Sequence, residues 1–255
     1  MRVAYRVVDG ATRVQTLHQA GCLKLRFPRP ISQAADAVLV NTAGGLAGGD
    51  DLTADIALGP ASALTVTTQA CERVYRSTGP NAQFSTRLVL GPQADLAYLP
   101  QETILFDGGR LARHLDVEAD ASARFVLAES VILGREAMGE RLGVGFLSDR
   151  WRIRVDGRLV YADDLRLSGD IGTGAMRAAT LDGAGAFTTL VARAPGIETR
   201  LAAVRSVLGP RGGASFVGDC LVVRLLAPDG QALRRILGPL VAAISECPLP
   251  RLWSL

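Results

Sequence analysis

The sequence predicts a mainly β fold: a layered, elongated β scaffold with a few α-helices. Three observations carry this prediction. Apolar and polar residues alternate in short runs through the first two-thirds of the chain, Gly-Pro pairs separate the runs, and a unit of about 30 residues repeats with weak similarity. Such a repeat favours stacked turn-and-strand units, each burying its face on the next, over a closed barrel.

The repeat consists of two segments that begin with Leu-Gly-Pro, residues 58–69 and 90–101, and of a fainter third copy, residues 119–130. In each copy a turn leads into an apolar stretch, which is the expected order for a coil of the chain that returns to the same sheet. Chance likeness between ordinary turn-and-strand units is the alternative.

Strands are predicted where apolar residues occupy every second position. In chain order these are residues 52–58, 64–67, 84–90, 114–118 and 187–194.

Near Pro195 the pattern changes to helical spacing. A helix is predicted over 198–208, one or two strands over 215–226, and an amphipathic helix over 231–245. Pro239 lies inside this last helix and is expected to kink or restart it.

We therefore expect one domain, residues 1–255, with a β-rich part (1–185) and a mixed α/β part (186–255). The second part is a β-α-β-α unit near the C-terminus. No linker rich in Gly and Ser separates the two parts, so this unit is expected to pack on the β scaffold.

Composition excludes several classes of protein. The chain has 255 residues, of which 48% are hydrophobic, so it can bury a substantial core. Its apolar runs are short and interrupted, and its first residues lack the long apolar segment of a secretion signal, so we expect a cytoplasmic protein with no membrane span. The net charge is +3 and aromatic residues make up 5%, which argues against nucleic-acid binding.

Residues suited to covalent or metal chemistry are scarce. The four cysteines, Cys22, Cys71, Cys220 and Cys247, form no CxxC pair and are interpreted as buried free thiols. Two histidines, His18 and His114, are too few for a durable transition-metal site. Lys24 is the only lysine, and no serine has a G-x-S-x-G setting. We predict that the chain is not an enzyme and binds no cofactor tightly.

A glycine-rich run, Asn41–Asp50, resembles a phosphate cradle. Such a cradle requires a helix directly after it, whereas here the pattern of a half-buried strand follows. The preferred interpretation is a strand-to-strand loop whose glycines permit positive φ and close backbone approach. A nucleotide- or metal-dependent enzyme that uses this loop is the alternative.

Four carboxylates stand out because they lie beside apolar strand residues or glycines: Asp50, Glu72, Glu129 and Asp163. A charge in such surroundings is costly unless it is paired or lines a wet cavity. Each acid can simply pair with an arginine, and Arg73, Arg135 and Arg166 are near in sequence. Together the acids can instead form a string of oxygen ligands for a divalent ion in transit.

Three segments carry a resemblance to a known family: NTAGGLAGGDDL (41–52), TTQACERVYRS (67–77) and LPQETILFDGGRL (99–111). LGREAMGE (133–140) and LPRLW (249–253) support them. From about His18 to the C-terminus the chain resembles urease accessory proteins of the UreD family, also called UreH. Arg73 stands where a lysine is common in that family.

The resemblance implies a scaffold that binds urease apoprotein and joins UreF and, through UreF, the GTPase UreG. A dimer of such accessory complexes is possible. The family fold is mainly β, and nickel is thought to pass through an internal channel toward urease. On that picture Asp50, Glu72, Glu129 and Asp163 line the channel and bind Ni²⁺ transiently, since oxygen ligands hold this ion more loosely than Cys and His clusters.

Other residues in the matching segments are expected to serve structure or partner contacts. They are Asn41, Gly44, Gly45, Gly48, Gly49, Gln69, Tyr75, Arg76, Gln101, Glu102, Asp107, Arg135 and Glu140. The alternative role is a structural chaperone that holds apo-urease open without conducting metal.

Overall fold

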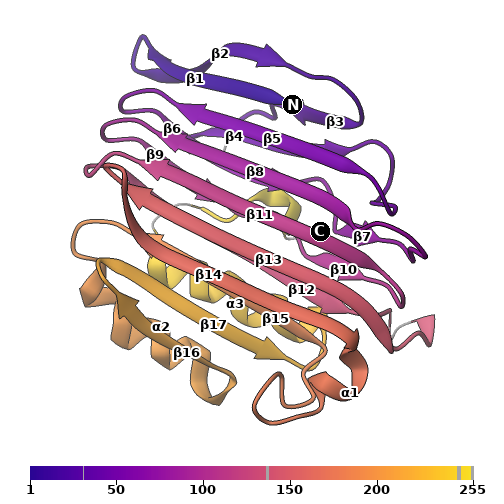
Figure 1. The fold of residues 1–255 in the computed structure, drawn as a ribbon. Coiled ribbons are helices and arrows are strands. Elements are labelled where there is room, and N and C mark those ends of the chain that lie inside the picture. Colours follow the sequence, from indigo (N-terminus) through magenta and orange to yellow (C-terminus); the bar gives the residue numbers. More distant parts are fainter. Residues whose placement is uncertain (31, 136–137, 246–247, 254–255) are drawn as a thin grey trace.

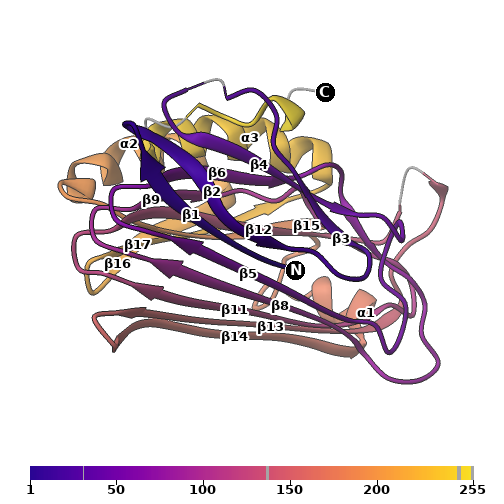
Figure 2. The same cartoon turned by 90° about the horizontal axis from the view of Figure 1, so that it is seen from above.

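The computed structural model describes residues 1–30, 32–135, 138–245 and 248–253. Two β-sheets stack face to face, and helices cover the outer face of one of them (Figures 1 and 2). The mainly β, layered and elongated scaffold predicted from the sequence is confirmed.

The first sheet has the strand order β14-β13-β11-β8-β5-β1-β2. Its strands are β1 (Arg2–Val8), β2 (Ala11–His18), β5 (Asp51–Leu58), β8 (Ala82–Leu90), β11 (Arg110–Ala119), β13 (Val144–Val155) and β14 (Arg158–Asp170). The neighbours from β5 to β13 are all parallel.

The second sheet has the order β16-β17-β15-β12-β9-β6-β4-β3, and β10 lies between β12 and β7. Its strands are β3 (Leu23–Arg26), β4 (Ala35–Asn41), β6 (Ala63–Thr68), β7 (Glu72–Val74), β9 (Asp95–Tyr98), β10 (Thr103–Leu105), β12 (Arg124–Leu133), β15 (Ala186–Arg193), β16 (Gly212–Val217) and β17 (Cys220–Ala227). The neighbours from β4 to β12 are parallel.

The chain alternates between the sheets, so each coil contributes one strand to each. The residues aligned in the sequence repeat are the residues paired in the sheets: Leu58 pairs with Leu90 in the first sheet, and Leu64 pairs with Leu96 in the second. The fainter third copy obeys the same register, because Phe125 pairs with Leu96. The predicted repeat is therefore real, and it is a stack of coils.

The turns that join the first sheet to the second also stack, at what we call the turn end of the coils. Ser62, Ala94 and Ala123 are equivalent positions, and all three are buried. Small side chains are needed there because consecutive turns hydrogen-bond to each other, as from the Ala61 N–H to the Pro92 carbonyl at 2.8 Å.

Apolar residues form two cores. One fills the space between the sheets and includes Leu88, Leu115 and Trp151. The other lies between the second sheet and the helices α2 (Leu201–Leu208) and α3 (Gly230–Ile244). The remaining helical segments are short: α1 (Ile171–Ala175), η2 (Ile197–Arg200), η3 (Gly209–Arg211) and η4 (Arg251–Trp253).

The C-terminal prediction is largely confirmed, since β15, α2, the hairpin β16–β17 and α3 follow in that order and β15 pairs with β12. Of the two outcomes expected at Pro239, a kink or a restart, the restart does not occur, because α3 runs through the proline. Pro239 lies on the exposed face of the helix, as does Arg235, whose carbonyl loses its helical donor and can bond to water instead.

Within the described parts of the chain, every helix is too short or too polar to cross a membrane.

Candidate functional site

The segments that carry the family resemblance lie together at the other end of the coils, which we call the motif end. It comprises the loop residues 41–50, 69–81, 99–109, 134–135 and 138–143 with the short strands β7 and β10. The coil register continues here, because Glu72 pairs with Thr103 and Thr103 with Val131. Residues of different segments thus meet one coil apart.

Side-chain contacts at the motif end follow this spacing. Asn41 bonds to Glu72 and the Cys71 thiol bonds to Glu102, in each case 31 residues along the chain. Arg76 pairs with Asp107, again at 31 residues. All four predicted motif residues among these six therefore contact a residue of another matching segment, and Arg76 and Asp107 contact each other.

The glycine-rich loop is followed directly by strand β5, as the strand-to-strand interpretation predicts. Gly45 has a φ of +152°, and a Cβ there would lie 2.3 Å from the Tyr75 ring. A Cβ at Gly48 would lie 2.0 Å from the Ser77 hydroxyl. Gly44 and Gly49 also have positive φ. The glycines allow the loop to lie against the next coil, whose Tyr75 hydroxyl donates to the Gly44 carbonyl at 3.1 Å.

Gln101 and Glu102 connect the loops to the helical layer. The Gln101 amide donates to the Thr68 and Gln69 carbonyls at 3.1 and 2.9 Å. Glu102 is buried and pairs with Arg234 of α3. These contacts hold the loops of the motif end to one another and to helix α3.

Asp107 and Glu140 are the acids of the outermost loops. Asp107 accepts the Val144 and Gly143 N–H groups, and these bonds hold its pKa below the ordinary value. Glu140 accepts the Asp107 N–H at 3.0 Å and pairs with Arg135, whose hydrogen bond lowers the pKa of Glu140. Both acids are therefore ionised at neutral pH.

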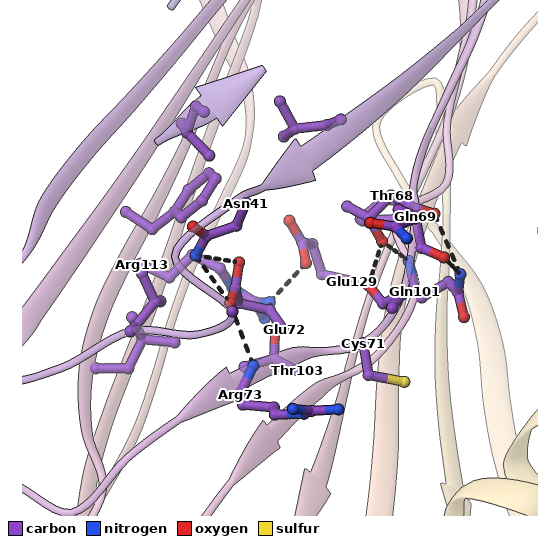
Figure 3. Close-up of a pocket in the computed structure, with 18 of the residues that line it drawn as sticks. Asn41, Thr68, Gln69, Cys71, Glu72, Arg73, Gln101, Thr103, Arg113 and Glu129 are labelled. Carbon is purple, nitrogen blue, oxygen red and sulfur yellow. Dashed lines mark hydrogen bonds and ion pairs between the residues drawn. The ribbon is translucent and has the colours of Figure 1, made fainter. Parts of the chain in front are cut away.

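A cavity of about 280 Å³ lies inside the motif end, between the sheets (Figure 3). Its polar lining consists of Asn41, Thr68, Gln69, Cys71, Glu72, Arg73, Gln101, Thr103, Arg113 and Glu129. Two of the four predicted conduit acids, Glu72 and Glu129, are thus brought to one cavity from different coils.

Glu72 lies at the half-buried side of this cavity. The Asn41 amide donates to both of its carboxylate oxygens at 3.2 Å, and the Arg73 N–H donates to one of them. Burial raises the pKa of Glu72 above its ordinary value, and these hydrogen bonds oppose the shift.

Glu129 lies at the inner wall in a buried network. Arg113 donates to Glu129 and to Asp149, both at 2.5 Å, and to the Thr103 hydroxyl at 3.2 Å. Two carboxylates thus face one guanidinium, so the core carries one excess negative charge whenever both carboxylates are ionised. Burial raises the pKa of Glu129 to about 7.

The sequence interpretation missed Arg113 and Asp149, although a signal exists. Arg113 falls between Leu111 and Leu115 on the inward phase of β11, and Asp149 holds the matching place in β13. A charge on the apolar phase of an alternating strand points into the core.

The other two predicted acids, Asp50 and Asp163, are not among the described residues that line the cavity. Asp50 accepts the Ala47 N–H at 2.8 Å and closes its own loop, close enough to Glu72 for its charge to raise the pKa of Glu72. Asp163 lies on β14 and pairs with Arg224 of β17 at 2.5 Å.

The arginine partners come from neighbouring strands, not from neighbouring sequence. Glu129 pairs with Arg113 and Asp163 with Arg224, so the expected partners Arg135 and Arg166 were the wrong choices for these acids.

The cysteines are free thiols where the structure describes them. Cys220 is buried as predicted, whereas Cys22 and Cys71 are only half-buried, and Cys247 lies outside the described residues. Within the described ranges, no three His, Cys, Asp or Glu side chains come together as a metal site.

The fold and the cavity define a class of protein: a stack of β-coils with a helical layer, whose polar loops surround an interior cavity at one end. The model of a family described as UreD urease accessory protein matches residues 1–254. The chain belongs to this family of urease accessory proteins.

Curated relatives agree over nearly their whole length. The chain is 47% identical to the urease accessory protein UreD of Rhizobium rhizogenes over 255 residues, which cover 99% of this chain and 93% of that protein. It is 49% identical to UreD of a Chelativorans species, with 100% and 92% covered, and 43% identical to UreD 1 of Brucella melitensis, with 97% and 90% covered.

Proposed function

We propose that this protein is a cytoplasmic accessory scaffold of urease maturation that binds urease apoprotein and, with UreF and UreG, passes Ni²⁺ to the urease active site through its interior. The scaffold performs no catalytic step and retains no metal. The single observation that carries the proposal is the cavity at the motif end, which Glu72 and Glu129 line from two different coils.

The chemistry of the cavity suits a cation that must leave again. Its polar walls offer carboxylate, amide, hydroxyl and thiol groups, and at its inner wall the carboxyl groups of Glu129 and Asp149 outnumber the guanidinium of Arg113. Oxygen donors bind Ni²⁺ weakly enough to release it, whereas clustered Cys and His ligands retain it. In the described contacts, the Glu72 carboxylate accepts from the Asn41 amide and the Arg73 backbone N–H but from no guanidinium, so Glu72 is the acid of this set most available to a passing ion.

Glu72→Gln tests the proposal because it removes the charge and keeps the shape. We expect urease activation at limiting nickel to fall severalfold while the complex with urease apoprotein and UreF still assembles in size-exclusion chromatography. The matched control is Glu118→Gln, since Glu118 is a half-buried acid of β11 outside the cavity. Equal activation by both variants would refute the conduit.

The structural chaperone remains the second candidate, and one observation favours it. The guanidinium of Arg113 occupies the inner wall of the cavity and holds Glu129 tightly, so an ion that passes there has to compete with it. In that case the same loops serve as contact surfaces, and nickel reaches urease by diffusion. Blocking the cavity without disturbing the fold distinguishes the two roles.

A further inference from the structure

A second hollow lies at the motif end, on the outer face of the second sheet. It is a groove of about 740 Å³ whose residues include Arg73, Tyr75, Ile104, Ile132, Met138 and Gly230. It is separate from the interior cavity, although Arg73 borders both.

The floor of the groove is set by strand register. Arg73, Ile104 and Ile132 are paired positions on β7, β10 and β12, so their side chains lie side by side on one face. Residues next to them in sequence, such as Val74 and Leu105, point into the core. Helix α3 covers this face of the sheet only as far as its first residue, Gly230, which abuts Ile132. Ile104 therefore lies beyond the helical layer.

The wall of the groove is apolar and exposed. Tyr75 packs edge-on against Phe106 with ring centroids 5.3 Å apart, and the Arg135 guanidinium lies 4.1 Å above the Phe106 ring. Met138 is 78% exposed and Tyr75 39%. Exposed aromatic, Met and Arg side chains that gather beside an apolar floor are typical of a protein-binding surface.

The charge of the groove selects the partner. Arg135 is paired with Glu140, and the acid of the groove, Asp229, accepts the Ala232 N–H at 2.7 Å where α3 begins. Asp229 is exposed at the β12 side of the floor, whereas Arg73 is exposed at the β7 side, so the groove is positive at its β7 side, where an acid of the partner can pair with Arg73. The floor spans two strand spacings, about 10 Å, which accommodates about three residues of extended chain.

We propose that this groove binds a short extended segment of a partner protein, in which apolar side chains cover Ile104 and Ile132 and a flanking Asp or Glu pairs with Arg73. The inference rests on the proposed scaffold role, because the partner is sought among urease apoprotein, UreF and UreG, but it does not depend on whether nickel passes through the cavity.

Photo-crosslinking identifies the occupant. A benzoylphenylalanine is placed at position 75 of the full chain, mixed with purified urease apoprotein, UreF and UreG, and crosslinked peptides are sequenced by mass spectrometry. The control carries the same group at position 159, where Leu159 is 49% exposed on β14. We expect a crosslink at position 75 to one partner segment with Asp or Glu within about three residues of an aliphatic side chain. Crosslinking no stronger than at position 159, to a second copy of this chain, or to a segment without an acid would overturn the proposal.

The mapped segment is then synthesised and its dissociation constant measured by fluorescence anisotropy. Arg73→Glu should weaken binding about tenfold or more, since it replaces a charge-assisted hydrogen bond by repulsion. Met138→Ser should weaken it severalfold. The controls Arg158→Glu and Met176→Ser alter exposed residues of the same types outside the groove and should leave the constant unchanged. Equal affinity for Arg73→Glu and the unaltered protein would contradict the proposal.

Discussion

The two ends of the β-coils are built from the same repeat but differ in the contacts that hold neighbouring coils together. At the turn end, short Gly-Pro turns stack through backbone hydrogen bonds, and their inward positions are small and buried. At the motif end, the loops are longer, their contacts run through charged and amide side chains, and they enclose the cavity. The comparison teaches that one periodic scaffold can form stacked turns at one end and, at the other end, longer loops whose side chains enclose a cavity.

Removing the buried guanidinium should have the largest effect on stability. Arg113→Met leaves Glu129 and Asp149 buried without their partner, which costs about 3–5 kcal/mol of unfolding free energy. The turn-end comparison is Arg124→Met, which breaks the exposed pair with Asp95 and should cost less than about 1 kcal/mol. Urea unfolding measures both. Similar losses for the two variants would contradict the distinction between the ends.

A glycine at each end gives the next test. Gly45→Ala forces a Cβ to 2.3 Å from the Tyr75 ring at a φ of +152°, and we expect a loss of about 1–3 kcal/mol. At the turn end, the nearest atom to a Cβ at Gly91 is 3.1 Å away and its φ is ordinary, so Gly91→Ala should cost less than about 1 kcal/mol. Thermal unfolding followed by circular dichroism compares them, and the reverse order would be inconsistent with the packing described.

The pH dependence of stability should differ between the interior acid, Glu129, and the loop acids, Asp107 and Glu140. Because burial raises the pKa of Glu129 from 4.5 to about 7, the folded state holds a proton that the unfolded state has released between these values. Stability should therefore fall as pH rises from about 5 to 7. The pKa values of Asp107 and Glu140 are lowered in the folded state, so these acids stabilise the fold at neutral pH. Their contribution to the free energy of unfolding is lost only as pH falls below about 4.

Glu129→Gln serves as the control for this slope. The difference in unfolding free energy between the two proteins, measured by urea titration at several pH values, isolates the contribution of Glu129 from those of the other ionisable groups. If the difference in unfolding free energy does not vary between pH 5 and 7, Glu129 neither gains nor loses a proton in that range, which would contradict the prediction.

The smallest effect is expected at the turn end and is stabilising. Ala61 and Gln93 occupy equivalent turn positions and have φ of 55° and 56°. Glycine relieves the strain of a side chain there, so Ala61→Gly and Gln93→Gly should each gain up to about 1 kcal/mol. Ala121→Gly, at a residue with ordinary φ, should instead lose about 0.5–1 kcal/mol. Loss of stability at positions 61 and 93 would contradict the strain argument.

The same contrast explains what sequence could predict. Alternation and the repeat predicted the strands and the stacked coils, because at the turn end each coil obeys the same local rules. The repeat also held unused information, since Asn41 and Glu72 are spaced by one coil and so are Arg76 and Asp107. Extending the register through the loops would have predicted these contacts.

The interior of the site could not be predicted in the same way. The Arg113 network joins β11 and β13 of one sheet to β12 of the other, so its geometry depends on how the sheets face each other rather than on the period. Asp163 has the sequence surroundings of a conduit acid, yet it is placed at β14 beside Arg224, away from the cavity. Burial of an acid alone does not say which cavity it reaches.

The most direct test of the central claim is the nickel content of urease after activation by a protein whose cavity is blocked. Ala70→Trp places a bulky side chain at the exposed rim of the cavity, and Ala162→Trp places the same group on an exposed site of β14. With complex assembly verified for both, we predict that nickel per urease site, measured by mass spectrometry of the metal, falls severalfold with Ala70→Trp and stays unchanged with Ala162→Trp. Full nickel loading by the blocked protein would contradict transport through the cavity and leave the structural chaperone as the function.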